Sequence, residues 1–232
     1  MDQYLITFLV CPLVAFLIGG IPFGLILTAL RGIDIRTVGS GNIGATNVAR
    51  ALGRNWGYFC FALDVLKGAL PTAAMHLLIQ RFDFSDSALG MFAWVLVGCA
   101  TVLGHVFPIY LRFKGGKGVA TSAGVALAIW PFFTLPALFA LLVWLIVTLL
   151  SRTVSVGSLI ACFAFLLSYI AGFWIFSRDR WIISAWSLDT QWPLLVFACL
   201  IPLLIIVRHR SNIARLLAGR ENRIKIGQDG NQ

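Results

Sequence analysis

The sequence predicts an all-α integral membrane protein with a single transmembrane domain over residues 1–226. Of its 232 residues, 59% are hydrophobic and only 12% are charged, whereas a soluble globular protein carries about 25% charged residues. The mean hydropathy is +0.91. Uncharged apolar runs recur along the chain, and a helix needs about 20 such residues to cross a bilayer. Residues 227–232 form a polar tail that we expect to be disordered.

The apolar runs predict seven transmembrane helices, some of them short or broken. Five runs are clear: Tyr4–Leu30, Trp56–Ile79, Ala88–Leu111, Val154–Phe176 and Trp192–Val207. A further run, Val119–Leu150, has 32 uncharged residues, which would extend about 48 Å as a helix and is too long for one span. Pro131 and Pro136 interrupt it. We therefore expect two short spans, Val119–Trp130 and Phe132–Leu150.

The basic residues predict the orientation in the membrane. With seven spans and the N-terminus outside, segments 31–55, 112–118, 151–153 and 208–232 face the cytoplasm. These segments carry 14 of the 18 Lys and Arg residues, and cytoplasmic loops of membrane proteins are enriched in them. Six spans would instead place the basic tail outside. We therefore expect an external N-terminus and a cytoplasmic C-terminus.

The net charge of +9 is compatible with a nucleic-acid binder, but the basic segments lack the interleaved aromatic residues that bind single strands. Anionic lipid or an anionic substrate is a better partner. The five cysteines each lie within an apolar run, and histidines and acids do not recur at metal-ligand spacings. We therefore predict no nucleic-acid partner, no metal and no cofactor.

A first polar cluster, VGSGNIGATNVAR, occupies residues 38–50. Glycines such as Gly39 and Gly41 allow backbone N–H groups to converge on an anion. The donor side chains beside them are Ser40, Asn42, Thr46, Asn47 and Arg50. The segment also matches the dinucleotide pattern G-x-G-x-x-G, followed by Asp64. That interpretation fails because Asp64 lies in a predicted span and not on a strand, so we predict a phosphate or carboxylate site.

A second cluster, GHVFPIYLRFKGGKGVAT, occupies residues 104–121. It resembles a nucleotide-binding P-loop, but Leu111 replaces the required glycine and Gly118 replaces the Ser or Thr that binds Mg²⁺. The turn that remains contains Lys114, Gly115, Gly116 and Lys117. It precedes a helix that begins near Val119, and a helix N-terminus beside lysines binds anions. We expect His105 to be a buried hydrogen-bonding residue.

A third cluster, RHRSNIARLLAGRE, occupies residues 208–221. A basic helix next to the membrane can simply anchor on anionic lipid. Such an anchor has no need of His209, Asn212 or Glu221. Because His209 lies beside a charged face, it could donate, accept or transfer a proton near neutral pH.

Two ionisable residues, Asp64 and Lys67, lie three positions apart in the second predicted span and therefore share a helix face. Ionisable side chains at membrane depth are costly and are candidates for function. The pair could also do no more than neutralise itself. We expect it to support the site.

Three anion-binding clusters on one membrane face indicate a membrane enzyme or transporter that acts on a phosphorylated substrate. A transporter should carry ionisable residues in several spans, and only Asp64 and Lys67 qualify. Membrane acyltransferases with thioester donors often carry the pattern H-x-x-x-x-D. A Tyr and an Ala occupy the final position of that pattern after His105 and His209.

The motifs GSGNIGATNVAR, GHVFPIYLRFKGGKGVAT and HRSNIARLLAGRE occur in this order and together resemble the three signatures of the bacterial acyl-phosphate:glycerol-3-phosphate acyltransferase family, PlsY. The resemblance covers residues 1–226. It implies a seven-helix enzyme of the bacterial inner membrane whose active site faces the cytoplasm. The implied reaction moves an acyl group from acyl phosphate to the 1-hydroxyl of glycerol 3-phosphate, giving lysophosphatidic acid and phosphate. This is the first committed step of phospholipid synthesis.

The clusters and the resemblance together assign the site residues. As catalytic residues we expect Ser40, His209 and Asn212. As phosphate-binding residues we expect Gly39, Gly41, Asn42, Arg50, Lys114, Gly115, Gly116 and Lys117. As supporting residues we expect Asp64, Lys67, Thr46, Asn47, His105 and Glu221.

The expected roles follow from the implied reaction. Lys117, Arg50 and the first-loop amides would bind phosphates, and Ser40 and Asn212 would orient the glycerol. His209 would bond to a phosphate or relay a proton, although a substrate phosphate could itself be the base. Ser40 could be a nucleophile with His209 as its base, but because acyl phosphate is already activated, transfer can be direct, with no acyl-enzyme. The fatty acyl chain of the substrate needs an apolar groove between spans. We also expect the enzyme to be a monomer.

Residues 172–191 depart from the compact family pattern. This segment and its border contain Trp174, Trp181, Trp186 and Trp192. Tryptophan is enriched at membrane interfaces, so we expect these four at the outer surface, with no effect on the chemistry.

Overall fold

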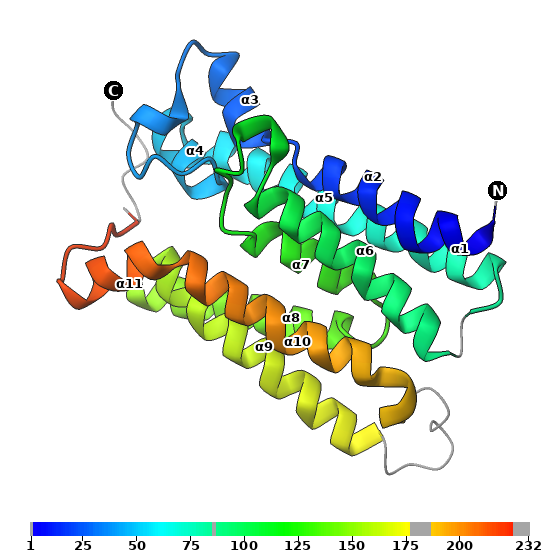
Figure 1. Ribbon diagram of the computed structural model, residues 1–232. Coiled ribbons are helices and arrows are strands. Elements are labelled where there is room, and N and C mark those ends of the chain that lie inside the picture. The colour runs from blue at the N-terminus through cyan, green and yellow to red at the C-terminus, as the bar shows by residue number, and fades with distance from the viewer. Residues whose placement is uncertain (1, 85–86, 177–186, 225–232) are drawn as a thin grey trace.

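The computed structural model describes residues 2–84, 87–176 and 187–224, and all regular structure within these ranges is helical (Figure 1). The α-helices are α1 (Gln3–Leu5), α2 (Cys11–Gly19), α3 (Phe23–Ala29), α4 (Ala45–Leu52), α5 (Arg54–Arg81), α6 (Ala88–Val106), α7 (Val119–Ala128), α8 (Thr134–Ser151), α9 (Val154–Phe176), α10 (Leu188–Arg208) and α11 (Arg210–Leu217). A π-helical stretch, η1 (Ile6–Val10), joins α1 to α2, and η2 (Ile35–Thr37) and η3 (Ile109–Leu111) are short 3₁₀ turns. The all-α prediction is confirmed for these residues.

Within the described ranges, six helical stretches are long and apolar enough to cross a membrane: Gln3–Ala29, Arg54–Arg81, Ala88–Leu111, Thr134–Ser151, Val154–Phe176 and Leu188–Arg208. The multi-pass membrane prediction is therefore confirmed. The remaining predicted span is helix α7, whose ten residues extend about 15 Å, half the hydrocarbon thickness. The chain turns around Pro131, between α7 and α8. Pro136 breaks nothing, because it lies in the first turn of α8, where a missing N–H is tolerated.

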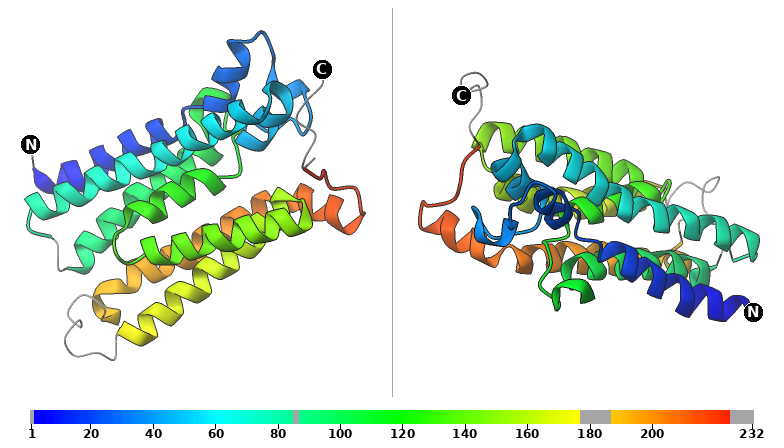
Figure 2. Two further views of the ribbon diagram at one scale, coloured as in Figure 1. Left: turned by 180° about the vertical axis from the view of Figure 1, so that it is seen from behind. Right: turned by 90° about the horizontal axis from the view of Figure 1, so that it is seen from above.

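The polar loops gather at one end of the bundle. In Figure 1, α3, α4 and α11 lie at this end and α1 lies at the other, and the two views in Figure 2 agree. Helix α5 packs on α7, α2 packs on α6, α8 packs on α9, and α10 packs on both α6 and α9. The three polar clusters are therefore neighbours in space, although they occupy residues 38–50, 104–121 and 208–221 of the sequence.

Glycines allow α5 and α7 to approach closely. A Cβ on Gly68 would overlap the Thr121 carbonyl oxygen, and a Cβ on Gly124 would overlap that of Val65. Small residues commonly allow such contacts between membrane helices. The contact holds the start of α7 beside Asp64, which lies on α5.

The break between α2 and α3 is stabilised by the buried Lys67. Its ammonium group donates to the Ile21 carbonyl oxygen at 2.8 Å and pairs with Asp64 Oδ1 at 2.8 Å. Both side chains are less than 5% exposed. A buried ion pair is tolerated when its remaining polar atoms find partners, so Lys67 holds Asp64 in place and links α5 to the broken first span.

An aromatic cluster fills the interior away from the polar end. The Phe133 ring lies 5.2 Å from Phe165, 4.9 Å from Tyr169 and 5.5 Å from Phe197, measured between ring centroids. The Phe133 side chain is fully buried. Phe165 and Phe197 of this cluster also line a cavity described below.

Part of the predicted outer surface lies outside the described residues, namely Trp181, Trp186 and the tail 227–232. Trp174 on α9 and Trp192 on α10 are 61% and 45% exposed. Both lie toward the end of the bundle opposite the polar loops.

Candidate active site

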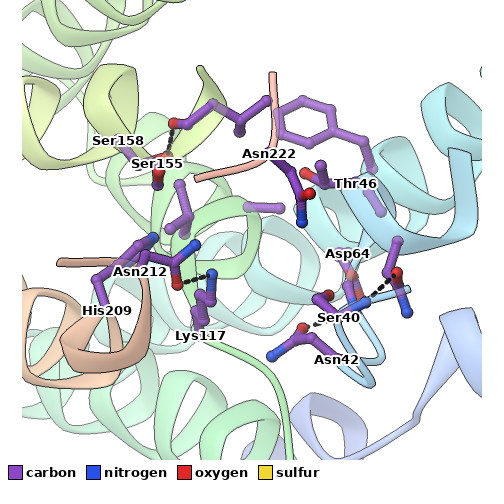
Figure 3. Close-up of a pocket in the computed structure, with 18 of the residues that line it drawn as sticks. Ser40, Asn42, Thr46, Asp64, Lys117, Ser155, Ser158, His209, Asn212 and Asn222 are labelled. Atoms are coloured by element: carbon purple, nitrogen blue, oxygen red, sulfur yellow. Dashed lines mark hydrogen bonds between the residues drawn. The ribbon is translucent and has the colours of Figure 1, made fainter. Parts of the chain in front are cut away.

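A polar cavity of about 120 Å³ lies where the three clusters meet (Figure 3). The predicted residues that line it are Ser40, Asn42, Thr46, Asn47, Arg50, Asp64, His105, Lys117, His209, Asn212 and Glu221. The predicted residues that do not line it are Gly39, Gly41, Lys67, Lys114, Gly115 and Gly116. Lys114 is exposed on the surface, and the glycines shape the loops that carry the lining side chains.

Asn47 organises the first loop from within. Its Nδ2 donates to the carbonyl oxygens of Ile35 and Val38 at 3.2 and 2.9 Å, and its Oδ1 accepts from the Ser40 N–H at 3.0 Å. A Cβ on Gly39, whose φ is 58°, would overlap the same Oδ1. Glycine at this position therefore allows the loop to close on Asn47 and fixes where Ser40 lies.

Ser40 and Asn42 face the cavity from this loop (Figure 3). The Asn42 Oδ1 accepts from the Gly44 N–H at 2.9 Å, which leaves the amide Nδ2 as a donor. Arg50, on α4, adds a guanidinium group to the same wall. This wall therefore offers hydrogen-bond donors and positive charge to an anion.

The second loop lies flat against the end of α6. The Gly116 N–H donates to the His105 carbonyl oxygen at 3.1 Å. A Cβ on Gly115 would overlap that carbonyl oxygen, and a Cβ on Gly116 would overlap the His105 imidazole. Because only glycine fits at both positions, the first bulky side chain after them, Lys117, is the one that enters the cavity. Its Nζ donates to Asn212 Oδ1 at 2.6 Å (Figure 3).

Glu221 ties the third cluster together. It accepts from Asn212 Nδ2 at 2.5 Å, from Ser155 Oγ at 2.9 Å and from Arg215 Nε at 2.7 Å. Burial opposes its ionisation, but these hydrogen bonds outweigh burial and lower the pKa of the Glu221 carboxyl. The carboxylate therefore joins α11 to the start of α9 and orients Asn212 toward Lys117.

His209 is a neutral imidazole held by its own helix. Its Nδ1 lies 2.8 Å from the Ile205 carbonyl oxygen, and a carbonyl can only accept, so Nδ1 carries the proton. Burial, followed by the nearby charge of Lys117, lowers the pKa of His209 to about 4. The imidazole therefore has Nε2 available as an acceptor at neutral pH.

Three cationic side chains, Arg50, Lys117 and Arg215, line the cavity. Burial lowers the pKa of Lys117 to about 8, and although Glu221 opposes this, Arg215 and Arg50 add to it. Close cations that lower each other's affinity for protons are stabilised when an anion binds among them. An anion that binds among these cations would therefore favour the charged form of Lys117.

The floor of the cavity contains Asp64 and His105. His105 Nδ1 lies 3.8 Å from Asp64 Oδ1, and both side chains are nearly inaccessible to solvent. Lys67 satisfies the charge of Asp64 from below. In the described part of the chain, no group of three or more His, Cys, Asp or Glu residues is placed to hold a metal ion.

A second, apolar cavity continues from the first between α7, α8, α9 and α10. Small and apolar side chains line it, including Ala123, Ala126, Ala137, Ala140, Ala161, Cys162, Phe165, Phe197 and Ile205. Four residues line both cavities: Phe61, Val119, Trp144 and Ser158. The Trp144 Nε1 donates to Ser158 Oγ at 3.3 Å, and its ring stacks on Phe61 at 6.2 Å between centroids.

Sequence reasoning missed several lining residues, among them Phe61, Trp144, Ser155 and Ser158. Each lies inside a predicted membrane span, where aromatic residues and occasional serines are ordinary. The available signal was weak: Ser155 and Ser158 are three positions apart at the start of a span, and so share a helix face.

The fold and the joined cavities define an integral membrane protein in which a cationic polar site opens onto an apolar groove. A family model described as glycerol-3-phosphate acyltransferase matches residues 9–219. Proteins named glycerol-3-phosphate acyltransferase from Aquifex aeolicus and Gluconobacter oxydans are each 44% identical to this chain. The first match covers 90% of this chain and 95% of the relative, and the second covers 98% of both. The chain therefore belongs to the glycerol-3-phosphate acyltransferase family and is an acyltransferase.

Two solved structures of PlsY, an integral membrane glycerol 3-phosphate acyltransferase, share this fold over 94% of this chain and 95% of theirs. The glycerol 3-phosphate form is 40% identical with a TM-score of 0.76, and the lysophosphatidic acid form is 39% identical with a TM-score of 0.75. The family predicted from the three motifs is confirmed.

Proposed function

We propose that this enzyme transfers a fatty acyl group from acyl phosphate to the sn-1 hydroxyl of glycerol 3-phosphate, giving lysophosphatidic acid and inorganic phosphate. The observation that carries the proposal is the wall shared by the two cavities, formed by Phe61, Val119, Trp144 and Ser158. An acyl phosphate joins a phosphate to an apolar chain, so it fits across this wall with its carbonyl between the cavities. The glycerol 3-phosphate and lysophosphatidic acid forms of the solved relative support the acceptor and the product.

The polar cavity has enough donors for the phosphates of both substrates. Arg50 and Lys117 supply charge, and Ser40 and Asn42 supply neutral donors. The start of α7 also reaches the cavity at Val119, and the first N–H groups of a helix favour anions. All of these groups come from one chain, which supports a monomeric enzyme.

In the proposed reaction, the sn-1 hydroxyl oxygen attacks the carbonyl carbon and the bond from that carbon to the phosphate oxygen breaks. The hydroxyl proton passes to phosphate, and no acyl-enzyme forms. Figure 3 shows Ser40 and His209 on opposite sides of the cavity, which favours direct transfer over a serine nucleophile activated by this histidine. Ser40 and Asn212 would orient the glycerol, and the neutral His209 would accept a hydrogen bond from it.

The test uses purified enzyme with glycerol 3-phosphate and either palmitoyl phosphate or palmitoyl-CoA. We expect lysophosphatidic acid from palmitoyl phosphate, with one phosphate released for each product molecule. Lysophosphatidic acid and phosphate can be followed separately, by mass spectrometry and by a colorimetric assay. Product from the CoA thioester alone would overturn the proposed donor and leave the family assignment intact.

We also propose seven passes, with the N-terminus outside and the active site at the cytoplasmic face of the bacterial inner membrane. Helix α7 would enter the membrane from the cytoplasmic side, and α8 would return to that side. Helices α1 and α11 lie at opposite ends of the bundle (Figure 1), as an odd number of crossings requires. The segments at the polar end carry most of the Lys and Arg residues, which supports a cytoplasmic location.

Cysteine labelling tests this topology in a variant that lacks the five native cysteines. Gln228→Cys should react with a membrane-impermeant maleimide only after the cells are opened. Asp83→Cys, between α5 and α6, is the matched control and should react in intact cells. The reverse pattern would place the active site on the outer face.

A further inference from the structure

Arg208, the last residue of α10, does not line either cavity but grips the loop that carries Lys117. Its Nη2 donates to the carbonyl oxygens of Gly115 and Gly116 at 3.2 and 3.3 Å. Its guanidinium carbon lies 5.6 Å from the centroid of the Phe107 ring, within the range of a cation–π contact. Arg208 is therefore held between the start and the end of the same loop.

The two glycine peptides are bonded on both sides. Their N–H groups donate to the carbonyl oxygens of Val106 and His105, at 3.2 and 3.1 Å, and their own carbonyls accept from Arg208. Glycine peptides are otherwise free to rotate, because no side chain restricts them. With donor and acceptor both engaged, the direction in which the chain leaves Gly116 is determined, and Lys117 follows directly.

We propose that Arg208 is a positioning residue for acyl transfer: it holds the Gly115–Gly116 peptides so that Lys117 enters the polar cavity at the correct place. It also turns two carbonyl oxygens toward itself and away from the anionic substrates. Because Arg208 directly precedes His209, the same contact fixes the position of the His209 imidazole relative to the Lys117 ammonium.

Arginine suits this role better than lysine. Its planar guanidinium group is always charged and can serve two acceptors while it stacks on an aromatic ring. A lysine has a compact, strongly hydrated charge that does not stack in this way. Arg208→Lys should therefore restore only part of what Arg208→Gln loses.

The kinetic test rests on the proposed function and compares Arg208→Gln with Arg210→Gln. Arg210 is exposed and lies two positions further on, at the start of α11, so its variant removes one positive charge from the same end of the bundle. We expect Arg208→Gln to lower kcat/KM about tenfold, mainly through a higher KM for the phosphate substrates, since one charge-assisted contact is lost. Arg210→Gln should remain close to native, and Arg208→Lys should lie between them.

A double variant separates positioning from general stability. If Arg208 acts through Lys117, then Arg208→Gln added to Lys117→Ala should cause little further loss. A full additional tenfold loss would show that Arg208 acts independently of Lys117 and would overturn the proposal.

Hydrogen exchange tests the contact between Arg208 and the Gly115–Gly116 peptides without any acyl transfer. In detergent or nanodiscs, peptides that cover residues 113–120 should exchange faster in Arg208→Gln than in Arg210→Gln, with other peptides unchanged. Equal exchange in the two variants would overturn the proposal that Arg208 holds these peptides in place. If palmitoyl phosphate is not a substrate, this exchange result still stands, so failure of the proposed reaction and failure of the positioning role are distinguishable.

Should Arg208→Gln not fold, Phe107→Leu provides a second test. It removes the ring on which Arg208 stacks and should change exchange and kinetics in the same direction but by less. Native exchange and kinetics in this variant would contradict the proposal.

Discussion

Replacing Lys117 with alanine is expected to lower kcat/KM for acyl transfer by about a thousandfold, the scale of losing one preorganised donor to a reacting oxyanion. The neighbouring glycines offer no substitute side chain. The variant also leaves Asn212 Oδ1, now 2.6 Å from the Lys117 ammonium, without this donor. Steady-state kinetics with palmitoyl phosphate and glycerol 3-phosphate measure the effect. Arg210→Gln removes an exposed charge at the same end of the bundle and should retain activity.

The pH dependence provides a second test of the same lysine. Burial lowers the pKa of Lys117 to about 8. Because the group is a cation, its charge is present below that pH and is lost above it. We therefore expect kcat/KM, which reports on the free enzyme, to fall as the pH rises through about 8. Lys117→Arg keeps its charge and should move this fall to higher pH. An unchanged profile, or near-native activity in Lys117→Ala, would contradict the assigned role.

Replacing His209 with alanine should lower kcat by about a hundredfold, at the lower end of the range for groups that assist proton transfer. A histidine with a pKa of about 4 is a weak base at neutral pH. We therefore expect it to orient the attacking hydroxyl as an acceptor, while phosphate takes the proton. The alanine variant should still bind glycerol 3-phosphate, which isothermal titration calorimetry can measure.

His209→Gln distinguishes an acceptor from a proton relay. Glutamine has an amide oxygen that can accept a hydrogen bond, but it does not titrate. We expect this variant to recover a substantial part of the activity lost in His209→Ala. If glutamine is as inactive as alanine while both variants fold and bind glycerol 3-phosphate, His209 transfers the proton itself.

The membrane fold and the family could be predicted from local information. Runs of apolar residues determine helices in a bilayer because every backbone N–H and C=O must be paired within the segment. The three motifs sufficed for the family because their polar residues have no role in an ordinary interhelical loop. Which of the two prolines interrupts the helix could not be predicted in this way. Pro131 lies in the turn between α7 and α8, whereas Pro136 is accommodated within α8.

The sequence predicted the cavity residues that lie in the polar motifs. It did not predict the single side chains that the membrane helices contribute to the cavity. Lys114 and Lys117 were both expected among the phosphate-binding residues, yet only Lys117 lines the cavity. The difference arises because Gly115 and Gly116 press against His105 and Arg208 grips their carbonyls. Trp144 resembles any other aromatic residue of a span, and only the packing places it between the two cavities.

The sequence by itself determined that this chain is a helical membrane protein, since composition and apolar runs are properties of neighbouring residues, and the resemblance of its three motifs to a known family predicted an acyltransferase. Only the tertiary structure decided which motif residues form the cavity and which hold the loops. It also decided that Ser155 bonds to Glu221, 66 positions away in the sequence, and that a polar site opens onto an apolar groove. These features depend on contacts between segments far apart in the chain, and such contacts form only when the helices pack.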